Sequence, residues 1–186
     1  LVLIIGGIDL SVGSVLGLAG AVLGVAMAQY QWPLAAAISL ALLTGAIAGL
    51  ANGLLIVRWQ LPSFIVTLGM LEAARGGAYL VTGSKTAYIG SRVEALHDFN
   101  LLGVGLPFVI AMLVVLAGQV LLQHTLAGRH LFALGGNEES ARLSGINIWR
   151  LRVFVFTVAG ALSGLAAVMH CARLGAADPN AGIGYE

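Results

Sequence analysis

Apolar stretches about as long as a lipid bilayer is thick constrain this sequence more than any other feature. The clearest runs from Pro33 to Val57 and contains no charged residue. About 20 apolar residues in a helix cross the hydrocarbon core of a bilayer. Of the 186 residues, 59% are hydrophobic and 9% are charged, and a soluble domain of this size could not bury so many apolar side chains. The sequence therefore predicts an all-α, polytopic transmembrane helical bundle.

Five apolar stretches are expected to cross the membrane, and the first of them is interrupted. They cover residues 1–28, 33–57, 63–82, 106–123 and 151–172. We expect residues 1–186 to form one transmembrane domain, and the absence of an initial Met and of a signal peptide favours an internal piece of a longer chain.

Small residues recur at every fourth position of the second stretch. They are Ala41, Gly45, Gly49 and Gly53. Such a stripe lets the backbone of a neighbouring helix approach closely. We therefore expect tight helix packing along this face rather than a ligand site.

The polar segment GGIDLSVGS interrupts the first apolar stretch. Its glycines loosen a helix, and a carboxylate such as that of Asp9 is unfavourable in hydrocarbon by about 3 kcal/mol. One hypothesis is a broken helix, with one half ending near Ile5 and the next beginning near Ser14. Asp9 and Ser11 would then cap the free amides of the second half. The alternative is that Asp9 caps a helix at the membrane surface.

Two charged residues lie inside the third stretch. Glu72 and Arg75 are three residues apart, which places them on one side of a helix, where they are expected to pair. Charges at this depth face the bundle or a water-filled path. The pair is therefore either a structural ion pair or part of the lining of a path.

The distribution of basic residues predicts the orientation of the chain. Arg58 and the four arginines within 124–152 fall on one side of the membrane, whereas Lys85 and Arg92 fall on the other, so the segment 124–152 is expected in the cytoplasm. Residues 83–105 are expected to form a solvent-side loop in which VEAL makes a short helix. The GSKT sequence in this loop lacks the glycine that precedes the lysine of a P-loop, so nucleotide binding is not expected.

The cytoplasmic segment contains the signals of a short helix. Asn137 can cap it, and Glu138 and Glu139 in the first turn interact favourably with the helix dipole. Gly145 can end it in a left-handed conformation. Such a short helix is marginal alone, so it is expected to dock on the chain's own helix ends or on a cytosolic partner.

The outer surface of this short helix is expected to be partly apolar. Ala141, Leu143 and Ile146 would form a small apolar surface, and Arg142 would remain charged beside it. Composition alone also allows an ordinary loop between two spans.

Three stretches resemble, in the same order, the ribose/xylose-type sugar ABC transporter permeases. They are GGIDLSVGS, LPSFIVTLGM and GRHLFALGGNEESARLSGIN. In the third, Glu139, Ala141 and Gly145 resemble the EAA-type coupling loop, with Ser140 in place of an alanine and no closing proline after Ile148. The resemblance implies the permease subunit of a bacterial inner-membrane sugar importer, without catalytic residues or cofactors of its own.

The resemblance also implies partners and roles for particular residues. The partners are a cytosolic ABC ATPase that hydrolyses ATP, a second permease copy in a homodimer or heterodimer, an external sugar-binding protein and the lipid bilayer. The cytoplasmic coupling loop would cover 124–150, with Asn137, Glu138, Glu139, Ala141, Arg142, Leu143 and Gly145 as the ATPase-coupling residues. The translocation path would include Gly6, Gly7, Asp9 and Ser11, with Glu72 and Arg75 as further candidates. The sugar is left open.

Other function classes are weighed against this interpretation. A secondary transporter would use GGIDLSVGS as its substrate site. An intramembrane hydrolase would use Ser163 and His170, which share a helix face but have no acidic residue beside them. The four histidines show no metal-ligand spacing, and a net charge of +1 does not favour nucleic acid as a partner.

Overall fold

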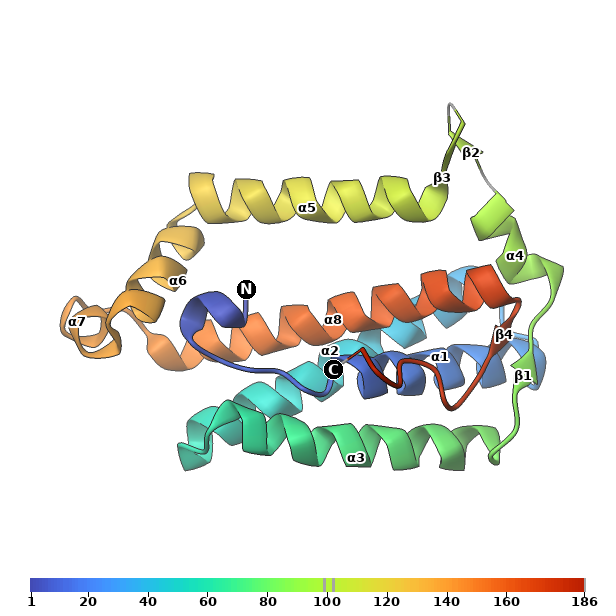
Figure 1. Cartoon of the computed structure of the whole chain (residues 1–186), viewed down its shortest axis with the longest axis horizontal. Helices are drawn as coiled ribbons and strands as arrows, with labels where there is room; N and C mark the ends of the chain where they lie inside the picture. Colours follow the sequence, from blue (N-terminus) through green and yellow to red (C-terminus); the bar gives the residue numbers. More distant parts are fainter. Residues whose placement is uncertain (99, 102, 186) are drawn as a thin grey trace.

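The computed structural model describes residues 1–98, 100–101 and 103–185, most of which lie in helices (Figure 1). The helices are η1 (Leu3–Ile5), α1 (Val12–Ala28), α2 (Leu34–Trp59), α3 (Ser63–Thr82), α4 (Ser91–Asp98), α5 (Leu106–His124), α6 (Leu126–Gly136), α7 (Glu138–Leu143) and α8 (Ile148–Leu174). Two antiparallel strand pairs join β1 (Ala87–Tyr88) to β4 (Ala176–Ala177) and β2 (Asn100–Leu101) to β3 (Val104–Gly105). The predicted helical fold class is confirmed.

Four of the described helices are long and apolar enough to cross a membrane. They are α2, α3, α5 and α8. The apolar helix α1 has only 17 residues, because the segment between η1 and Val12 is not helical. The interruption expected in the first apolar stretch is thus present.

The most extensive helix contact joins α2 to α8 through small residues. A Cβ atom on Gly45 or Gly49 of α2 would overlap the backbone carbonyl of Gly160 or Phe156. A Cβ on Gly164 would come within 2.6 Å of the Ala41 carbonyl oxygen. Only glycine permits this approach of two backbones, and the close packing predicted for the second stretch is confirmed.

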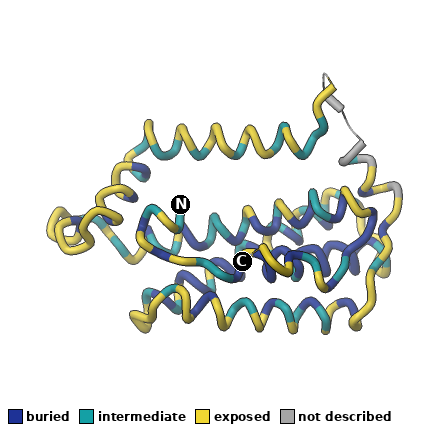
Figure 2. Tube along the Cα trace, in the orientation of Figure 1, coloured by how far each residue is buried: buried dark blue, intermediate teal, exposed yellow. Residues whose placement is uncertain are grey.

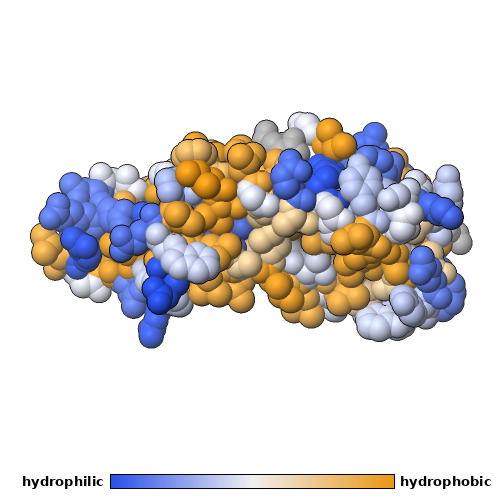
Figure 3. All heavy atoms as spheres, turned by 90° about the horizontal axis from the view of Figure 1, so that it is seen from below, coloured by the Kyte–Doolittle hydropathy of each residue, from blue (hydrophilic) through white to orange (hydrophobic). Residues whose placement is uncertain are grey.

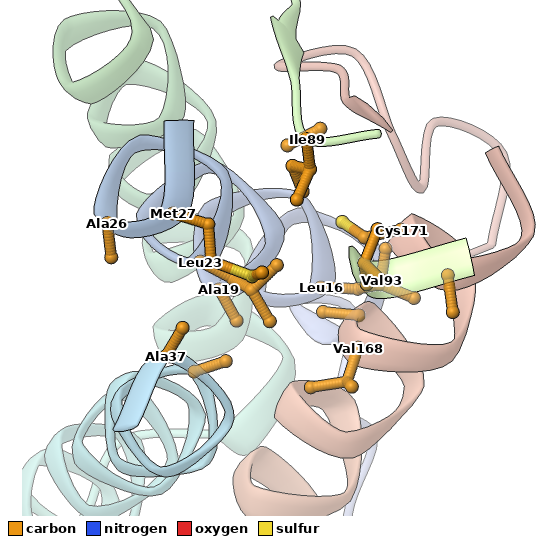
Figure 4. Packing of buried hydrophobic residues seen from close by; sticks show 14 residues of the cluster. Leu16, Ala19, Leu23, Ala26, Met27, Ala37, Ile89, Val93, Val168 and Cys171 are labelled. Carbon is orange, nitrogen blue, oxygen red and sulfur yellow. The ribbon is translucent and has the colours of Figure 1, made fainter. Parts of the chain in front are cut away.

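The core surrounds α1, which is buried along most of its length (Figure 2). Figure 4 shows Leu23 and Met27 of α1 in one buried apolar cluster with Val168 of α8 and, from the segment 83–105, Ile89 and Val93. Ile89 is 9% exposed and Val93 is fully buried. This corrects the expectation of a solvent-side loop: VEAL does lie in a helix, α4, but that helix buries its apolar side against the bundle.

Helix α5 lies apart from the other long helices (Figure 1). None of its described residues is buried, and Figure 2 shows it as exposed or half-buried throughout. It joins the bundle through α4 at one end and α6 at the other. The segment predicted to be cytoplasmic therefore begins at the end of the most exposed span.

Aromatic side chains mark both ends of the bundle. Tyr30 and Trp32 are exposed before α2, and Trp59 and Trp149 are exposed where α2 ends and α8 begins. Figure 3 shows hydrophilic residues at both ends of the molecule and mainly apolar ones between. Tryptophan and tyrosine are enriched at the two membrane interfaces, so this arrangement fits helices that cross a bilayer.

Candidate coupling surface and translocation path

Helix α7 forms at the predicted place and with the predicted caps. The Asn137 side-chain oxygen accepts a hydrogen bond from the Ser140 N–H at 2.9 Å, as an N-cap does. Glu138 and Glu139 occupy the first turn, next to the positive end of the helix dipole. Gly145 has a φ of 80°, the left-handed conformation that favours glycine. The predicted helix and its two ends are confirmed.

The side chains of α7 divide between the bundle and the exterior, which corrects the expected apolar surface. Ala141 is 3% exposed and packs inward, whereas Leu143 is 82% exposed. Ile146 is half-buried against an apolar cluster at this end of the bundle. Residues two apart on a helix point in different directions, so Ala141 and Leu143 cannot share one face. The exposed members of the predicted coupling set are Asn137, Glu138, Glu139, Arg142, Leu143 and Gly145.

An ion pair joins α7 to α8. The Glu138 carboxylate accepts from the Arg152 guanidinium at 2.6 Å. Both side chains are partly exposed, and such a pair contributes about 0–1 kcal/mol to stability. Its main effect is therefore to connect the short helix to the start of a long one.

Helix α6 connects the same end of the molecule to η1, and sequence reasoning did not find it. A Cβ atom on Gly135 would overlap the Ile4 carbonyl, so the two backbones lie in direct contact. Leu131 and Leu134 are buried in the cluster that includes Ile5. The signal that could have identified α6 is its N-cap, Thr125, whose hydroxyl accepts from the Gly128 N–H at 3.1 Å.

The break between η1 and α1 is held by hydroxyl groups of α3. The Ile8 N–H donates to the Ser63 Oγ at 2.9 Å and the Leu10 N–H donates to the Thr67 Oγ1 at 3.1 Å. Ser63 and Thr67 are one helical turn apart on α3, so they face the same extended segment. They belong to LPSFIVTLGM, and the first two of the three stretches that carry the resemblance are therefore in contact.

The Asp9 carboxylate accepts hydrogen bonds from the nearby Ser11 rather than from the amides in the first turn of α1. Its Oδ1 accepts from the Ser11 N–H at 2.9 Å and from the Ser11 hydroxyl at 2.6 Å. The Ser11 Oγ in turn accepts from the buried Asn52 amide at 3.0 Å. Ser11 is the N-cap residue of α1 but makes no side-chain cap bond. The expectation that Asp9 and Ser11 cap the amides of the second half-helix is therefore wrong.

Arg75 does not form the ion pair expected from its spacing to Glu72. Its guanidinium donates to the Ala181 carbonyl at 2.9 Å and to the Ser14 Oγ at 3.3 Å. No ion pair between Glu72 and Arg75 occurs among the described residues. The Ala181 carbonyl could not be predicted as a partner of Arg75 because it lies 106 residues away along the chain.

A cavity of about 730 Å³ lies where the break, the turn between α2 and α3, and helix α7 meet. Gly6 and Gly7 of the break, Glu138 and Arg142 of α7, and Trp149 of α8 contribute to its wall. The other predicted path residues, Asp9, Ser11, Glu72 and Arg75, do not line it. The structure thus brings parts of all three sequence stretches together at one end of the bundle.

The residues suggested for a hydrolase do not form a catalytic pair in this structure. The Ser163 hydroxyl is buried and donates to the Ala159 carbonyl of its own helix at 3.1 Å, as membrane-helix hydroxyls commonly do. His170 instead makes an edge contact with the Tyr185 ring, at 6.5 Å between ring centres. This arrangement does not favour hydrolase chemistry.

Known proteins similar to this chain are permease components. A family model described as "Branched-chain amino acid transport system / permease component" matches residues 1–186. The chain is 38% identical over 191 residues to the ribose import permease protein RbsC of Escherichia coli K12, covering 100% of the chain and 59% of that protein. It is 36% identical to the D-allose transport system permease protein AlsC of the same strain, covering 99% of the chain and 57% of that protein. It is 32% identical to the fructose import permease protein FruG of Bifidobacterium longum, covering 97% of the chain and 56% of that protein.

The similarity extends along the whole chain, although the chain spans less than two thirds of the length of these relatives. No solved structure matches it. The resemblance to sugar ABC permeases is confirmed, and with several apolar helices of membrane-spanning length the chain is part of a multi-pass membrane protein. The chain therefore belongs to the family described as branched-chain amino acid transport system permease components.

Proposed function

We propose that this chain is part of the membrane subunit of an ATP-driven monosaccharide importer in the bacterial inner membrane. The names of its relatives, which specify ribose, allose, arabinose and fructose transport or import, support this class of substrate. In this proposal a cytosolic ABC ATPase hydrolyses ATP, a second permease copy completes the path and an external binding protein delivers the sugar.

The observation that carries the proposal is the exposed, capped helix α7 at one end of the molecule (Figure 1). Glu139, Arg142 and Leu143 leave a charged and apolar surface uncovered on it. A short helix of this kind is marginal without a partner. We assign the ATPase as that partner, within a cytoplasmic coupling loop at 124–150.

The contacts of α7 supply a route for movement from the ATPase to the spans. The ion pair between Glu138 and Arg152 connects it to α8. Through α6, the contact of Gly135 with Ile4 connects it to η1 and the break. Movement of α7 can drive transport if the ATPase binds the two permease conformations with different affinities.

The test is uptake by the full-length permease reconstituted with its ATPase and binding protein in proteoliposomes. We expect uptake of at least one of ribose, allose, arabinose and fructose that requires ATP. Uptake driven by an ion gradient in the absence of ATPase would instead identify a secondary transporter.

A further inference from the structure

A group of polar side chains is exposed halfway along α3. Glu72 is nine residues after Ser63 and ten before Thr82, so it lies about 14 Å from either end of the helix. The residue is exposed, and it makes no hydrogen bond or ion pair with any residue that the structure describes. A carboxylate facing hydrocarbon at this depth is strongly unfavourable. This face of α3 therefore requires water or protein against it.

Two further polar groups lie along the same face. Tyr79 is seven residues after Glu72, two helical turns along one side of α3. Its hydroxyl donates to the exposed Asn180 side-chain oxygen at 2.7 Å. Asn180 is held by Asp178, whose Oδ1 accepts from the Asn180 N–H at 2.8 Å and from its amide at 3.1 Å. Helix α3 and the segment after α8 thus contribute to one polar surface.

The segment after α8 turns back along the bundle, and the chain ends near the middle of the molecule (Figure 1). The Arg75 guanidinium donates to the carbonyls of Pro179, at 3.4 Å, and Ala181, at 2.9 Å. On the other side, a Cβ atom on Gly182 would overlap the backbone of Gly13 in α1. Non-helical backbone at membrane depth persists only where it is buried in protein or lines a water-filled cavity. The segment is clamped between α1 and α3, yet Asn180, Ile183 and Tyr185 remain exposed.

The surface around Glu72 is open in this structure. Gly69 and Gly76 flank it, and a Cβ atom on either would meet no atom within 4 Å. Ala73 beside them is exposed. Figure 3, which views the molecule from the side of α3, shows hydrophilic atoms midway along it, next to apolar areas.

We infer that this face lines the water-filled sugar path, and that Glu72, Tyr79 and Asn180 bind the hydroxyl groups of the passing monosaccharide. The inference rests on the proposed import function. Each sugar hydroxyl can donate one hydrogen bond and accept two. The carboxylate accepts from adjacent hydroxyls, and the phenol and the amide can both donate and accept. Arg75 is a positioning residue that holds Asn180 within reach of Tyr79.

The first experiment measures access of water to position 72 in the full-length permease assembled with its ATPase in membranes. We expect a membrane-impermeant methanethiosulfonate reagent to label Glu72→Cys, and ribose imported through the transporter to slow the labelling. The control is Ile47→Cys, an exposed position near the middle of α2 with 63% exposure, which we expect to stay unlabelled. The native Cys171 is 2% exposed and should not react.

An equally unreactive thiol at positions 72 and 47 would overturn the inference. If position 72 is unreactive because another permease covers it, Glu72→Cys will form disulfides between permease copies, and the face is then a subunit interface.

The second experiment separates sugar binding from a structural role. Asn180→Ala and Tyr79→Phe should change the ratio of ribose to arabinose uptake by threefold or more at unchanged expression. Glu72→Gln keeps a hydrogen-bonding group and should retain more uptake than Glu72→Leu. Equal loss for all sugars, or no loss in Glu72→Leu, would contradict the site. If wild-type permease shows no ATP-dependent uptake, the proposed function fails, whereas normal wild-type uptake with an unlabelled position 72 rejects only this inference.

Discussion

The contact between α2 and α8 and the contact that holds α7 represent two kinds of attachment in one chain. Along α2 and α8, glycines bring two backbones together over several turns, from Gly164 against Ala41 to Gly53 against Val153. Helix α7, in contrast, is attached mainly by the buried Ala141 and the ion pair of Glu138 with Arg152. The first contact leaves no room for sliding, whereas the second can shift at small energetic cost.

This difference suggests that α2 and α8 belong to a rigid frame, whereas α7 is a movable lever. Packed interiors resist displacement because every shift loses contacts, while exposed ion pairs reform readily in water. An ATPase that pulls on α7 would move the lever relative to the frame. The following variants test whether the two regions differ as described.

The largest effect is expected for Gly49→Leu in the frame. The new side chain would overlap the Phe156 carbonyl on α8, and overpacking of this kind destabilises by about 3 kcal/mol. We expect a lower thermal unfolding temperature of the full-length permease in detergent and loss of uptake. Gly118→Leu on α5, where a Cβ meets no atom within 4 Å, is the matched control. Equal stability of the two variants would contradict the rigid frame.

The second largest loss of stability is expected at the break between η1 and α1, where α3 holds non-helical backbone. In Thr67→Val the half-buried Leu10 N–H loses its acceptor, which costs about 1 kcal/mol, at the lower end of the range for an unsatisfied donor. Thermal unfolding should occur at a lower temperature, and Thr67→Ser should restore it. Ser39→Ala is the control, because among the described residues the Ser39 hydroxyl bonds only the Ala35 carbonyl of its own helix. A Thr67→Val variant as stable as Ser39→Ala would show that α3 does not hold the break.

Glu138→Lys is expected to affect the lever and leave the frame intact. It places two positive charges where Glu138 and Arg152 now pair. Uptake should fall by about tenfold, within the usual range of coupling free energies, while stability changes by no more than about 1 kcal/mol. The measurement is sugar transported per ATP hydrolysed in proteoliposomes. The charge swap Glu138→Lys with Arg152→Glu should recover uptake, and failure to recover would assign Glu138 another role.

The smallest effect on stability is expected at the outer surface of α7. Leu143→Ser changes a residue that is 82% exposed, so the free energy of unfolding should change by less than about 0.5 kcal/mol. Binding of the ATPase should nevertheless weaken by about fivefold, as for an interface residue worth about 1 kcal/mol. Leu80→Ser, with 85% exposure at the far end of α3, is the control for binding. Equal affinity of both variants for the ATPase would contradict docking at α7.

Local features of the structure were predictable from the sequence. Asn137, Glu138 and Gly145 predict α7 because each acts on backbone within a few residues. The Ala41 to Gly53 stripe predicts a close helix contact, although its partner on α8 was not identified. The interruption at GGIDLSVGS was predictable since glycine and aspartate are unfavourable within an apolar helix.

The partners of the interrupting segment were not predictable. The Ser63 and Thr67 hydroxyls that satisfy it lie 55 and 57 residues away along the chain. The burial of Val93 was missed as well, because a polar composition around it masks a single inward apolar face. Such contacts depend on how whole helices are placed and leave no local signal.

The sequence by itself determined that the chain forms apolar helices of bilayer length, that the first is interrupted and that Asn137 caps a short helix. These outcomes depend on hydrophobicity, caps and glycine positions, which act locally. Only the tertiary structure decided that Arg75 binds the segment after α8 and that Glu72 is left exposed beside Tyr79 and Asn180. The reason is physical: a charge three residues from its opposite can pair with it, but carbonyl oxygens brought close by folding compete for the same guanidinium.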